Sequence, residues 1–441
     1  MRIPKLPATY FWPAVILLHL LGLVQAWHTG SIYLVDSIDY LSQAENIGKH
    51  GSLYAAPWDM PIKPDYYSFR PPVYGLLIYL LKLIFASDYW ILLVQSFISI
   101  STIWGVRKMI SEWGYDLEKL NSFLLAILIV YPSQIIHCNF VMSDILFQAL
   151  LFWSFYFTVK LWQNPSYHAA GRASLLFALA MLTKPVAFLL GISVAIILVF
   201  VFLKQKKAQY LLPFLLLPFV YHSYAQYNKQ QTGYYHYSSV TPIFVLKYMA
   251  KYTNGQLFGE AYADSVQDHI MARANTAKSY EERYTLMNGE GKRIIMEHPL
   301  FFAWFNVKGW IALMIDPGRF EWVHFLNMEE GTYPGLYHSI HTQGLWKGIW
   351  FFMQHAPLHL LFLLAFCLCM NVWISVLFLR YLFQAHQSVI IRICIFLFVG
   401  YIMASTGVLG LSRYRIAIAP FLWMAALLVL IPQTKHVATD K

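Results

Sequence analysis

The first acidic motif of the chain, Asp36-Ser-Ile-Asp39-Tyr40, follows the first long hydrophobic segment. Carboxylates are costly to keep at a membrane boundary, and ionisable residues in such places commonly have a function. A carboxylate there can take a proton from an attacking hydroxyl group, hold a cation or pair with a basic residue. Aspartate is also common in solvated loops, so the position of the motif alone does not decide between catalysis and solvation.

The composition is that of a polytopic membrane protein. Hydrophobic residues make up 58% of the 441 residues and charged residues only 12%, and the mean hydropathy is +0.50. A chain of this length accommodates about ten transmembrane helices of roughly 20 residues each, together with one sizeable region that does not cross. We therefore predict an all-α polytopic membrane protein.

The charge and cysteine patterns exclude other classes of protein. The net charge of +10 lies largely in short loops such as 204–207, which is typical of topology determinants and of contacts with anionic lipids. Basic residues do not alternate with aromatic ones as on a nucleic-acid surface, so no nucleic acid is expected. The cysteines lack the spacing of a metal site or a disulfide framework; they are Cys138, Cys367, Cys369 and Cys394.

The distribution of basic residues predicts that both termini lie in the cytoplasm. Arg2 and Lys5 precede the first hydrophobic segment. The end of that segment, Val24-Gln-Ala26, also resembles a signal-peptide cleavage site, and in either case Asp36 lies outside. Placing the later basic loops inside as well gives about ten spans. The predicted spans are 11–27, 89–106, 124–136, 145–159, 174–183, 186–203, 210–227, 358–379, 390–409 and 416–431.

Three further segments are predicted to lie at the outer surface. Residues 37–50 have apolar side chains at helical spacing but are too polar to cross, which indicates an amphipathic surface helix. Segments 72–86 and 299–314 each contain a lysine, and counting either one as a span would place later basic residues outside. We therefore predict that both are interfacial, juxtamembrane helices.

These assignments divide the chain into three parts. Residues 1–227 form an N-terminal transmembrane module whose outer loop, 28–88, carries the acidic motif. Residues 228–357 form a non-cytoplasmic loop region with interfacial helices, in which Asn-Gly pairs after Thr253 and Met287 indicate turns. Residues 358–441 form the C-terminal transmembrane helices.

The topology gathers a specific set of charged residues on the non-cytoplasmic side. Lysine and arginine normally avoid short outer turns, so basic residues there need a reason. A basic cluster beside carboxylates at a bilayer surface suits the phosphate group of a lipid, because guanidinium groups bind phosphate oxygens in pairs. The acids of this set are Asp36, Asp39 and Asp144, and the bases include Arg70, Lys184, Arg413 and Arg415.

Each of these residues also has a simpler interpretation. On this simpler interpretation, Arg413 and Arg415 bind lipid headgroups without selectivity. Lys184 then only extends from a helix end to the membrane interface. Arg70 would merely precede a helix that begins at Pro71-Pro72.

Two other features stay open in the same way. Ser143 or Asp144 would cap the helix that begins at Ile145. His137, His222 and His236 lie near the outer face without strong ligand spacing, so the sequence assigns no metal ligand.

With these residues placed, the chain resembles the GT-C superfamily of polyprenyl-phosphate-dependent glycosyltransferases. The resemblance is to the bacterial branch related to dolichyl-phosphate-mannose protein mannosyltransferases and to the lipid A aminoarabinose transferase. The motifs that carry it, in chain order, are Asp36-Ser-Ile-Asp39-Tyr40-Leu, Arg70-Pro71-Pro72-Val-Tyr74, Pro132-Ser133 with Ser143-Asp144, Leu182-Thr-Lys184-Pro185, and Arg413-Tyr414-Arg415 with Pro420. The chain departs from the family at Ala417, where proline is frequent, and no Glu/His metal pair can be placed.

The resemblance implies transfer of a sugar from a polyprenyl-phosphate donor to a hydroxyl acceptor at the outer membrane face, with inversion. Asp36 is expected to act as general base, with a pKa raised by Asp39 and by a partly dry cleft. Asp144 is expected to orient the acceptor or Asp36, or to hold a cation. The expected phosphate ligands are Arg70, Lys184, Arg413 and Arg415; Tyr40 and Tyr74 are expected to line the sugar pocket.

The implied partners are a polyprenyl-phosphate sugar, such as an undecaprenyl one, a lipid, polysaccharide or protein acceptor, and the bilayer. No cofactor is assigned with certainty, and a divalent cation stays open. The expected location is the inner (plasma) membrane of a bacterium, with the site facing the periplasm or the outside. Two alternatives remain at this point: a polyprenyl-lipid transporter or flippase, and a non-catalytic lipid-binding relative.

Overall fold

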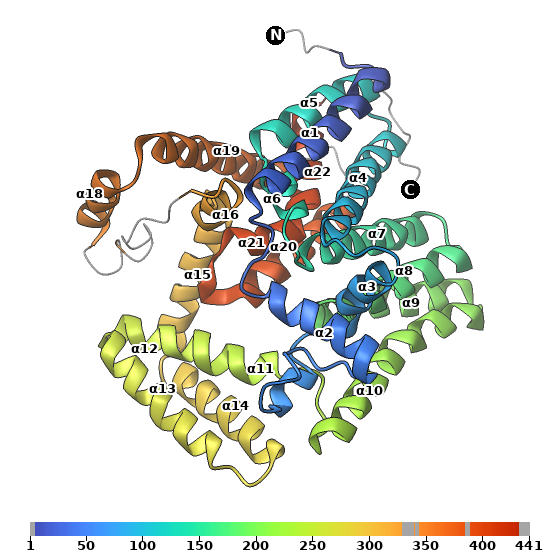
Figure 1. Ribbon diagram of the computed structural model, residues 1–441. Coiled ribbons are helices and arrows are strands. Elements are labelled where there is room, and N and C mark those ends of the chain that lie inside the picture. The colour runs from blue at the N-terminus through green and yellow to red at the C-terminus, as the bar shows by residue number, and fades with distance from the viewer. Residues whose placement is uncertain (1–4, 329–338, 340–343, 384–388, 432–441) are drawn as a thin grey trace.

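The computed structural model describes residues 5–328, 339, 344–383 and 389–431. These residues fold into helices, and no strand occurs among them. Figure 1 shows the N-terminal helices α1 (Ala8–Thr29), α4 (Tyr89–Glu112) and α5 (Leu117–Val130) beside α22 (Ala419–Leu430). The helices between residues 251 and 297 form a group at the opposite end of the view.

The remaining elements of the N-terminal part are α2 (Ser37–His50), a 3-10 turn η1 (Pro64–Tyr67), α3 (Pro72–Lys82), α6 (Ser133–Cys138), α7 (Asp144–Gln163), α8 (Tyr167–Met181), α9 (Ala187–Gln205), η2 (Ala208–Tyr210) and α10 (Leu211–Thr232). The later elements are α11 (Val240–Ile243), a π-helix η3 (Phe244–Ala250), α12 (Lys251–Phe258), α13 (Glu260–Asn275), α14 (Tyr280–Glu297), α15 (Pro299–Ile315), α16 (Arg319–Phe325), α18 (Leu345–His355), α19 (Leu358–Phe383), α20 (Val389–Thr406), η4 (Gly407–Leu409), α21 (Ser412–Arg415) and η5 (Ile416–Ile418).

Within the described residues, seven helical segments are long and apolar enough to cross a membrane. They are α1, α4, α7, α9, α19, α20 with η4, and the run from α21 through α22. Each coincides with a predicted span, which confirms the prediction of an all-α polytopic membrane protein.

The other three predicted spans fall on α5 with α6, on α8 and on α10. The span predicted at 124–136 is interrupted, because α5 ends at Val130 and α6 begins only at Ser133. Helix α8 has 15 residues, or about 22 Å, less than the roughly 30 Å of a hydrocarbon core. The total of about ten spans therefore stays a prediction.

Helix α2 has the predicted bounds, and α3 is short. The 11 residues of α3 extend about 16 Å, too little to cross the hydrocarbon core, in line with the interfacial position predicted for it. The two helices pack closely at Gly75, because a β-carbon there would overlap the side chain of Gln43.

Residues 228–328 are more regularly helical than predicted. The two Asn-Gly pairs that indicated turns lie inside α12 and α14. Thr253 and Met287, which precede them, are 0% and 1% exposed. Tertiary packing therefore overrides the local turn preference at both places.

A chain of buried polar side chains fixes α6 inside the bundle. His19 of α1 and Gln134 of α6 both bond the Ser99 hydroxyl of α4, at 3.0 and 2.9 Å. Gln134 and Gln148 of α7 exchange two amide hydrogen bonds of 2.8 Å each. The Gln148 amide also donates to the carbonyl oxygen of Ile416 at 2.6 Å. The network therefore ties α1, α4, α6 and α7 to the turn that precedes α22.

Helix α15 contacts the turn η4 through two glycines. A β-carbon on Gly309 would overlap the carbonyl oxygen of Gly407 and lie 3.0 Å from the α-carbon of Val408. These neighbours are backbone atoms, which cannot rotate away as a side chain can.

We expect Gly309→Ala to destabilise the protein by about 1–3 kcal/mol through overpacking. Gly289→Ala is the matched control, because Gly289 also lies inside a helix but has nothing within 4 Å of the added carbon. Alanine there should raise stability by about 0.5–1 kcal/mol. The midpoint temperature of unfolding in detergent measures both effects, and a fall of equal size in the two variants would contradict the packing argument.

Candidate functional site

Three carboxylates and three basic side chains from five segments meet in one ion-pair cluster. Asp36 precedes α2 and Asp39 lies in its first turn, whereas Asp144 is the first residue of α7. The bases come from the loop before α3, the loop between α8 and α9, and α21; they are Arg70, Lys184 and Arg413. The structure therefore brings together six of the seven charged residues that the sequence analysis gathered.

Arg70 joins the two aspartates of the first motif. Its Nη2 lies 2.8 Å from Asp36 Oδ1 and 2.8 Å from Asp39 Oδ2, and its Nε donates to the same Asp39 oxygen at 3.0 Å. The guanidinium also lies over the rings of Phe69 and Tyr40, at 4.5 and 5.1 Å from the centroids. Cation–π contacts of this kind add to the ion pairs and restrict the orientation of the guanidinium.

Arg413 joins the first motif to α7. Its Nη1 lies 2.6 Å from Asp36 Oδ2, and its Nε donates to Asp144 Oδ2 at 3.2 Å. The second oxygen of Asp144 accepts from Lys184 Nζ at 2.6 Å. Asp144 is only 4% exposed, whereas Asp36 and Arg413 are 22% and 21% exposed. The three formal charges of each sign cancel, so the cluster is neutral as a whole, and its most exposed members are Asp36 and Arg413.

The electrostatic environment of the two motif aspartates differs from the prediction. Burial raises the pKa of Asp36, but the attraction of Arg413 and Arg70 outweighs it, so this pKa lies below the ordinary value. Burial raises the pKa of Asp39 and exceeds the opposing effect of Arg70. The expectation of a raised pKa for Asp36 is therefore wrong for this structure, because both of its oxygens are paired with arginine.

Tyr40 and Tyr74 are buried and do not line an opening. They are 1% and 0% exposed and meet edge to face at 4.8 Å. The Tyr40 hydroxyl bonds Ser143 Oγ at 2.7 Å, and the Tyr74 hydroxyl donates to Gln95 at 2.6 Å. Their predicted place lining a sugar pocket is not supported, since full burial leaves no ring surface for a ligand.

The capping alternative for α7 is also not what the structure shows. Ser143 precedes the helix without making a side-chain cap, and Asp144 uses both oxygens for ion pairs. The alternative for Arg70 is true in part, because α3 does begin at Pro72, but the side chain still belongs to the cluster.

Arg415 is the charged residue that the structure places elsewhere. It is 2% exposed, and its Nε donates to the hydroxyl of Tyr131. Its Nη1 donates to the carbonyl oxygens of Leu313 and Met314, at 3.2 and 3.0 Å. Arginine in this position satisfies the free carbonyl groups at the end of α15. These contacts assign Arg415 to the support of the fold and not to the group of phosphate ligands.

The α21 turn that carries Arg413 is held by two acids that the sequence analysis missed. Ser412 donates its N–H to Asp316 Oδ2 at 2.7 Å and its hydroxyl to Glu321 Oε1 at 2.6 Å. Glu321 is 7% exposed, and burial with the nearby charge of Asp316 raises its pKa. No local signal in the sequence links Glu321 to Ser412, which is 91 positions later.

A second group of hydrogen bonds, which we call the latch, fastens the loop before Arg70 to the region after α10. Ser68 Oγ bonds His236 Nε2 at 2.8 Å and accepts the N–H of Ser239 at 3.0 Å. Ser239 Oγ donates to the carbonyl oxygen of Asp65 at 2.6 Å. The carboxylate of Asp65 accepts from Tyr280 and Arg283 of α14, both at 3.1 Å.

The three histidines that were predicted to lie near the outer face are not brought together. His236 belongs to the latch, and His222 bonds the Tyr235 hydroxyl at 2.7 Å. His137 Nε2 lies 3.9 Å from Glu321 Oε1, and burial lowers the pKa of His137 to about 4. Among the described residues, no group of three or more histidine, cysteine or acidic side chains could hold a metal ion.

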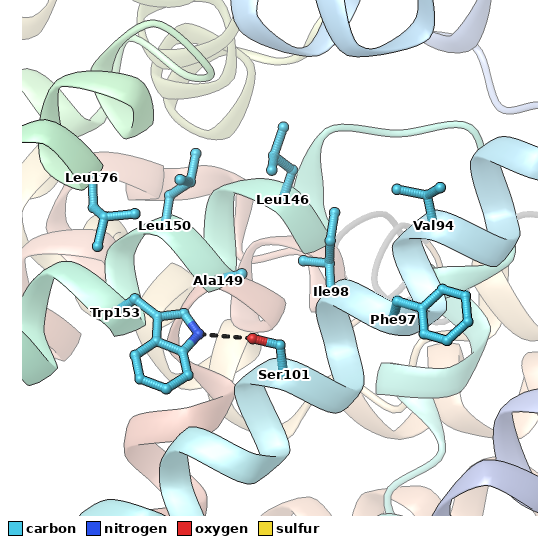
Figure 2. A pocket seen from close by; sticks show the side chains of 9 residues that line it. All are labelled: Val94, Phe97, Ile98, Ser101, Leu146, Ala149, Leu150, Trp153 and Leu176. Atoms are coloured by element: carbon cyan, nitrogen blue, oxygen red, sulfur yellow. Dashed lines mark hydrogen bonds between the residues drawn. The ribbon is translucent and has the colours of Figure 1, made fainter. Parts of the chain in front are cut away.

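An apolar pocket of about 410 Å³ lies between α4, α7 and α8 (Figure 2). Leu146 and Trp153 of α7 line it, two to nine residues after Asp144, or about 3–14 Å along the helix axis. Its polar contact is a hydrogen bond of 3.0 Å from Trp153 to Ser101. The other lining residues are Val94, Phe97, Ile98, Ala149, Leu150 and Leu176.

Comparisons with known proteins give only a distant likeness. No family model and no curated protein matches the sequence. Two crystal structures of ArnT from Cupriavidus metallidurans are similar, one bound to undecaprenyl phosphate and one in the apo state. Their TM-scores are 0.40 and 0.37, with 12% and 13% identity, over 96% of this chain and 77% of theirs. The likeness is too low to assign a family.

The latch generates a prediction about the helices it holds. Asp65→Asn removes the charge that pairs with Arg283. We therefore expect the free energy needed to detach α11 to α14 from the rest of the protein to fall by about 1–3 kcal/mol. The rate of limited tryptic cleavage within residues 240–297 measures this detachment.

Asp264→Asn is the control for that experiment. Asp264 pairs with Lys251 at 2.6 Å within the same helices, but it is 54% exposed, and such surface pairs contribute only about 0–1 kcal/mol. Equal cleavage rates in the two variants would contradict the role assigned to the latch.

Proposed function

We propose that the protein is a membrane glycosyltransferase of the GT-C type. It transfers a sugar from a polyprenyl-phosphate donor to a hydroxyl acceptor at the non-cytoplasmic face. The observation that carries this proposal is the neutral, partly exposed cluster in which Arg413 and Arg70 both bind Asp36. In such a cluster the carboxylate is a potential base and the arginines are potential ligands for an anion. The carboxylate and the arginines stay paired with each other until an anion binds.

Binding of a lipid phosphate would exchange the partners within the cluster. Phosphate oxygens bind guanidinium groups in the same paired geometry as carboxylates do. As Arg413 and Arg70 turn toward the phosphate, Asp36 loses the attraction that holds its pKa low, while burial continues to raise it. Donor binding therefore activates Asp36 as a general base.

The reaction then balances as an inverting substitution. The acceptor oxygen forms a bond to the anomeric carbon, and the bond between that carbon and the phosphate oxygen breaks. The acceptor proton passes to Asp36. The leaving polyprenyl phosphate gains one negative charge, which Arg70, Arg413 and Lys184 stabilise. Asp144 holds Arg413 and Lys184 in place from the buried side.

The apolar pocket between α4, α7 and α8 supports a lipid substrate. Its walls are apolar apart from the bond between Trp153 and Ser101. Since an α-helix turns by about 100° per residue, the residues of α7 that line the pocket lie on the face opposite Asp144, so the pocket fits an apolar chain but does not open directly onto the cluster. In this proposal the region between α10 and α18 selects the acceptor, whether it is a lipid, a polysaccharide or a protein.

Replacement of Asp36 separates catalysis from binding. Asp36→Asn removes the base, so turnover should fall about a hundred- to ten-thousandfold. The same change removes a competitor for both arginines, so undecaprenyl phosphate should bind as tightly as to the wild type or more tightly. The measurements are release of free undecaprenyl phosphate from its mannosyl and glucosyl derivatives in nanodiscs supplied with lipid, polysaccharide and protein hydroxyl acceptors, and equilibrium binding of the bare lipid.

Near-normal turnover in that variant would rule out Asp36 as the base. Wild-type protein that binds these lipids without releasing undecaprenyl phosphate would instead favour one of the two alternatives, a flippase or a non-catalytic lipid-binding protein. Asp59→Asn in the same outer loop is the control for loss of one acidic charge.

Replacement of Arg413 tests the phosphate ligands. Arg413→Ala should weaken binding of undecaprenyl phosphate about ten- to a hundredfold, the loss expected for a hydrogen bond to a charged group. Arg413→Lys should restore only part of the affinity, since lysine cannot contact two carboxylates and the phosphate in the fork geometry. Arg293→Ala is the control, because Arg293 is 59% exposed in surface pairs of α14. Unchanged binding by Arg413→Ala would contradict the phosphate role.

A further inference from the structure

Residues 240–258 form one continuous helical rod made of α11, η3 and α12. Its middle part, Phe244–Ala250, is π-helical over seven residues. Most π-helical segments are single turns and many of them occur at functional sites, because the wider turn is less stable than an α-helical one. None of the steps of the proposed reaction involves a residue of this rod.

The start of the rod is fastened to the support of Arg70. Ser238 and Ser239 immediately precede it, and their hydroxyls donate to the carbonyl oxygens of Ser68 and Asp65 at 3.1 and 2.6 Å. Ser68 is only two residues before Arg70. The position of the rod is therefore tied to the basic residue on the first-motif side of the cluster.

The π-helical part packs against η4, the turn that precedes α21 and Arg413. A β-carbon added to Gly407 would lie 3.1 Å from the terminal carbon of Met249, and Gly407 precedes Arg413 by six residues. On its inner face, Leu246 and Ala250 are 1% and 0% exposed and pack against α14. The rod thus extends from the hydrogen bonds with Ser68 and Asp65 to the contact with η4, the turn that precedes α21.

Three aromatic residues follow another face of the rod. Phe244 and Tyr248 have ring centroids 5.8 Å apart, and Tyr248 and Tyr252 are 6.2 Å apart. Tyr248 and Tyr252 are 40% and 41% exposed. Tyr248 directly precedes Met249, whose terminal carbon lies beside Gly407 of η4, the turn that leads to α21 and Arg413.

We propose that Tyr248, with Tyr252 one turn further along, forms the wall on which the sugar ring of the donor packs. The inference rests on the proposed function. A sugar carried on a phosphate is one glycosidic bond away from the group that Arg413 binds, so its ring must lie beside that arginine. Tyrosine offers a rigid, amphipathic surface at low entropic cost. The buried rings of Tyr40 and Tyr74 cannot supply it.

The test compares lipids that differ only in the sugar. Full-length protein in nanodiscs is titrated with undecaprenyl phosphate and with undecaprenyl phosphate carrying mannose or glucose. These two sugars differ at one carbon, and a wall that contacts the face of the ring accepts both. Tyr248→Ala should weaken binding of the glycosylated lipids about three- to tenfold and leave the bare lipid unchanged.

Two further variants make the comparison specific. Tyr248→Phe keeps the ring and should retain most of the affinity for the glycosylated lipids. Tyr262→Ala removes an aromatic side chain of α13 that is 51% exposed, and it should change neither affinity. Tyr252→Ala should have a smaller effect than Tyr248→Ala, because Tyr252 lies about one turn further along the rod from Met249 and its contact beside Gly407.

The contrary outcomes are distinct. Equal weakening of bare and glycosylated lipid by Tyr248→Ala would place the residue in the phosphate or lipid site and overturn the wall. If Tyr248→Ala weakens binding of neither lipid, Tyr248 is only an aromatic residue of the membrane interface. This result would also overturn the proposed wall. If wild-type protein binds bare undecaprenyl phosphate no better than Arg413→Ala does, the proposed function fails first and the wall fails with it.

Discussion

The interaction on which the site depends is the sharing of Arg413 between two carboxylates. Asp36 precedes it by 377 positions and Asp144 by 269, so one guanidinium joins α2, α7 and the turn before the last helix. Removing one member of such a partly buried group leaves an uncompensated charge, which costs much more than the intact group contributes. The positions of these three segments are therefore mutually dependent.

The surrounding structure fixes the direction of that arginine mainly with polar contacts. Ser412 is held by Asp316 and Glu321, and the carbonyl group of Ile416 is held by Gln148. The turn of four residues that carries Arg413 is thus bonded on both sides. Within a bilayer, apolar contacts between helices gain little over contacts with lipid, so hydrogen bonds and close backbone packing decide how helices are oriented. The contact between Gly309 and Gly407 is the packing counterpart of these bonds.

The sequence was sufficient to predict the class of fold, the bounds of α2 and the meeting of six charged residues. These features follow from position along the chain, which hydropathy and the positive-inside rule report. They say nothing of side-chain direction. Arg413 and Arg415 are two residues apart, yet the first points into the cluster and the second to the end of α15. The same limit explains why Tyr40 and Tyr74 were expected in an opening although they are buried.

The sign of the pKa shift of Asp36 was mispredicted for a related reason. Burial and a neighbouring carboxylate raise the pKa of an acid, and both were visible in the sequence. The outcome depends on whether an arginine reaches the same oxygens, which only three-dimensional geometry decides. In the proposed reaction this reversal has a use. While Arg413 and Arg70 hold Asp36 as a weak base, the site does not activate water or an acceptor. When the two arginines move to the phosphate, the same displacement creates the base and stabilises the leaving group, so reactivity appears only with the donor in place.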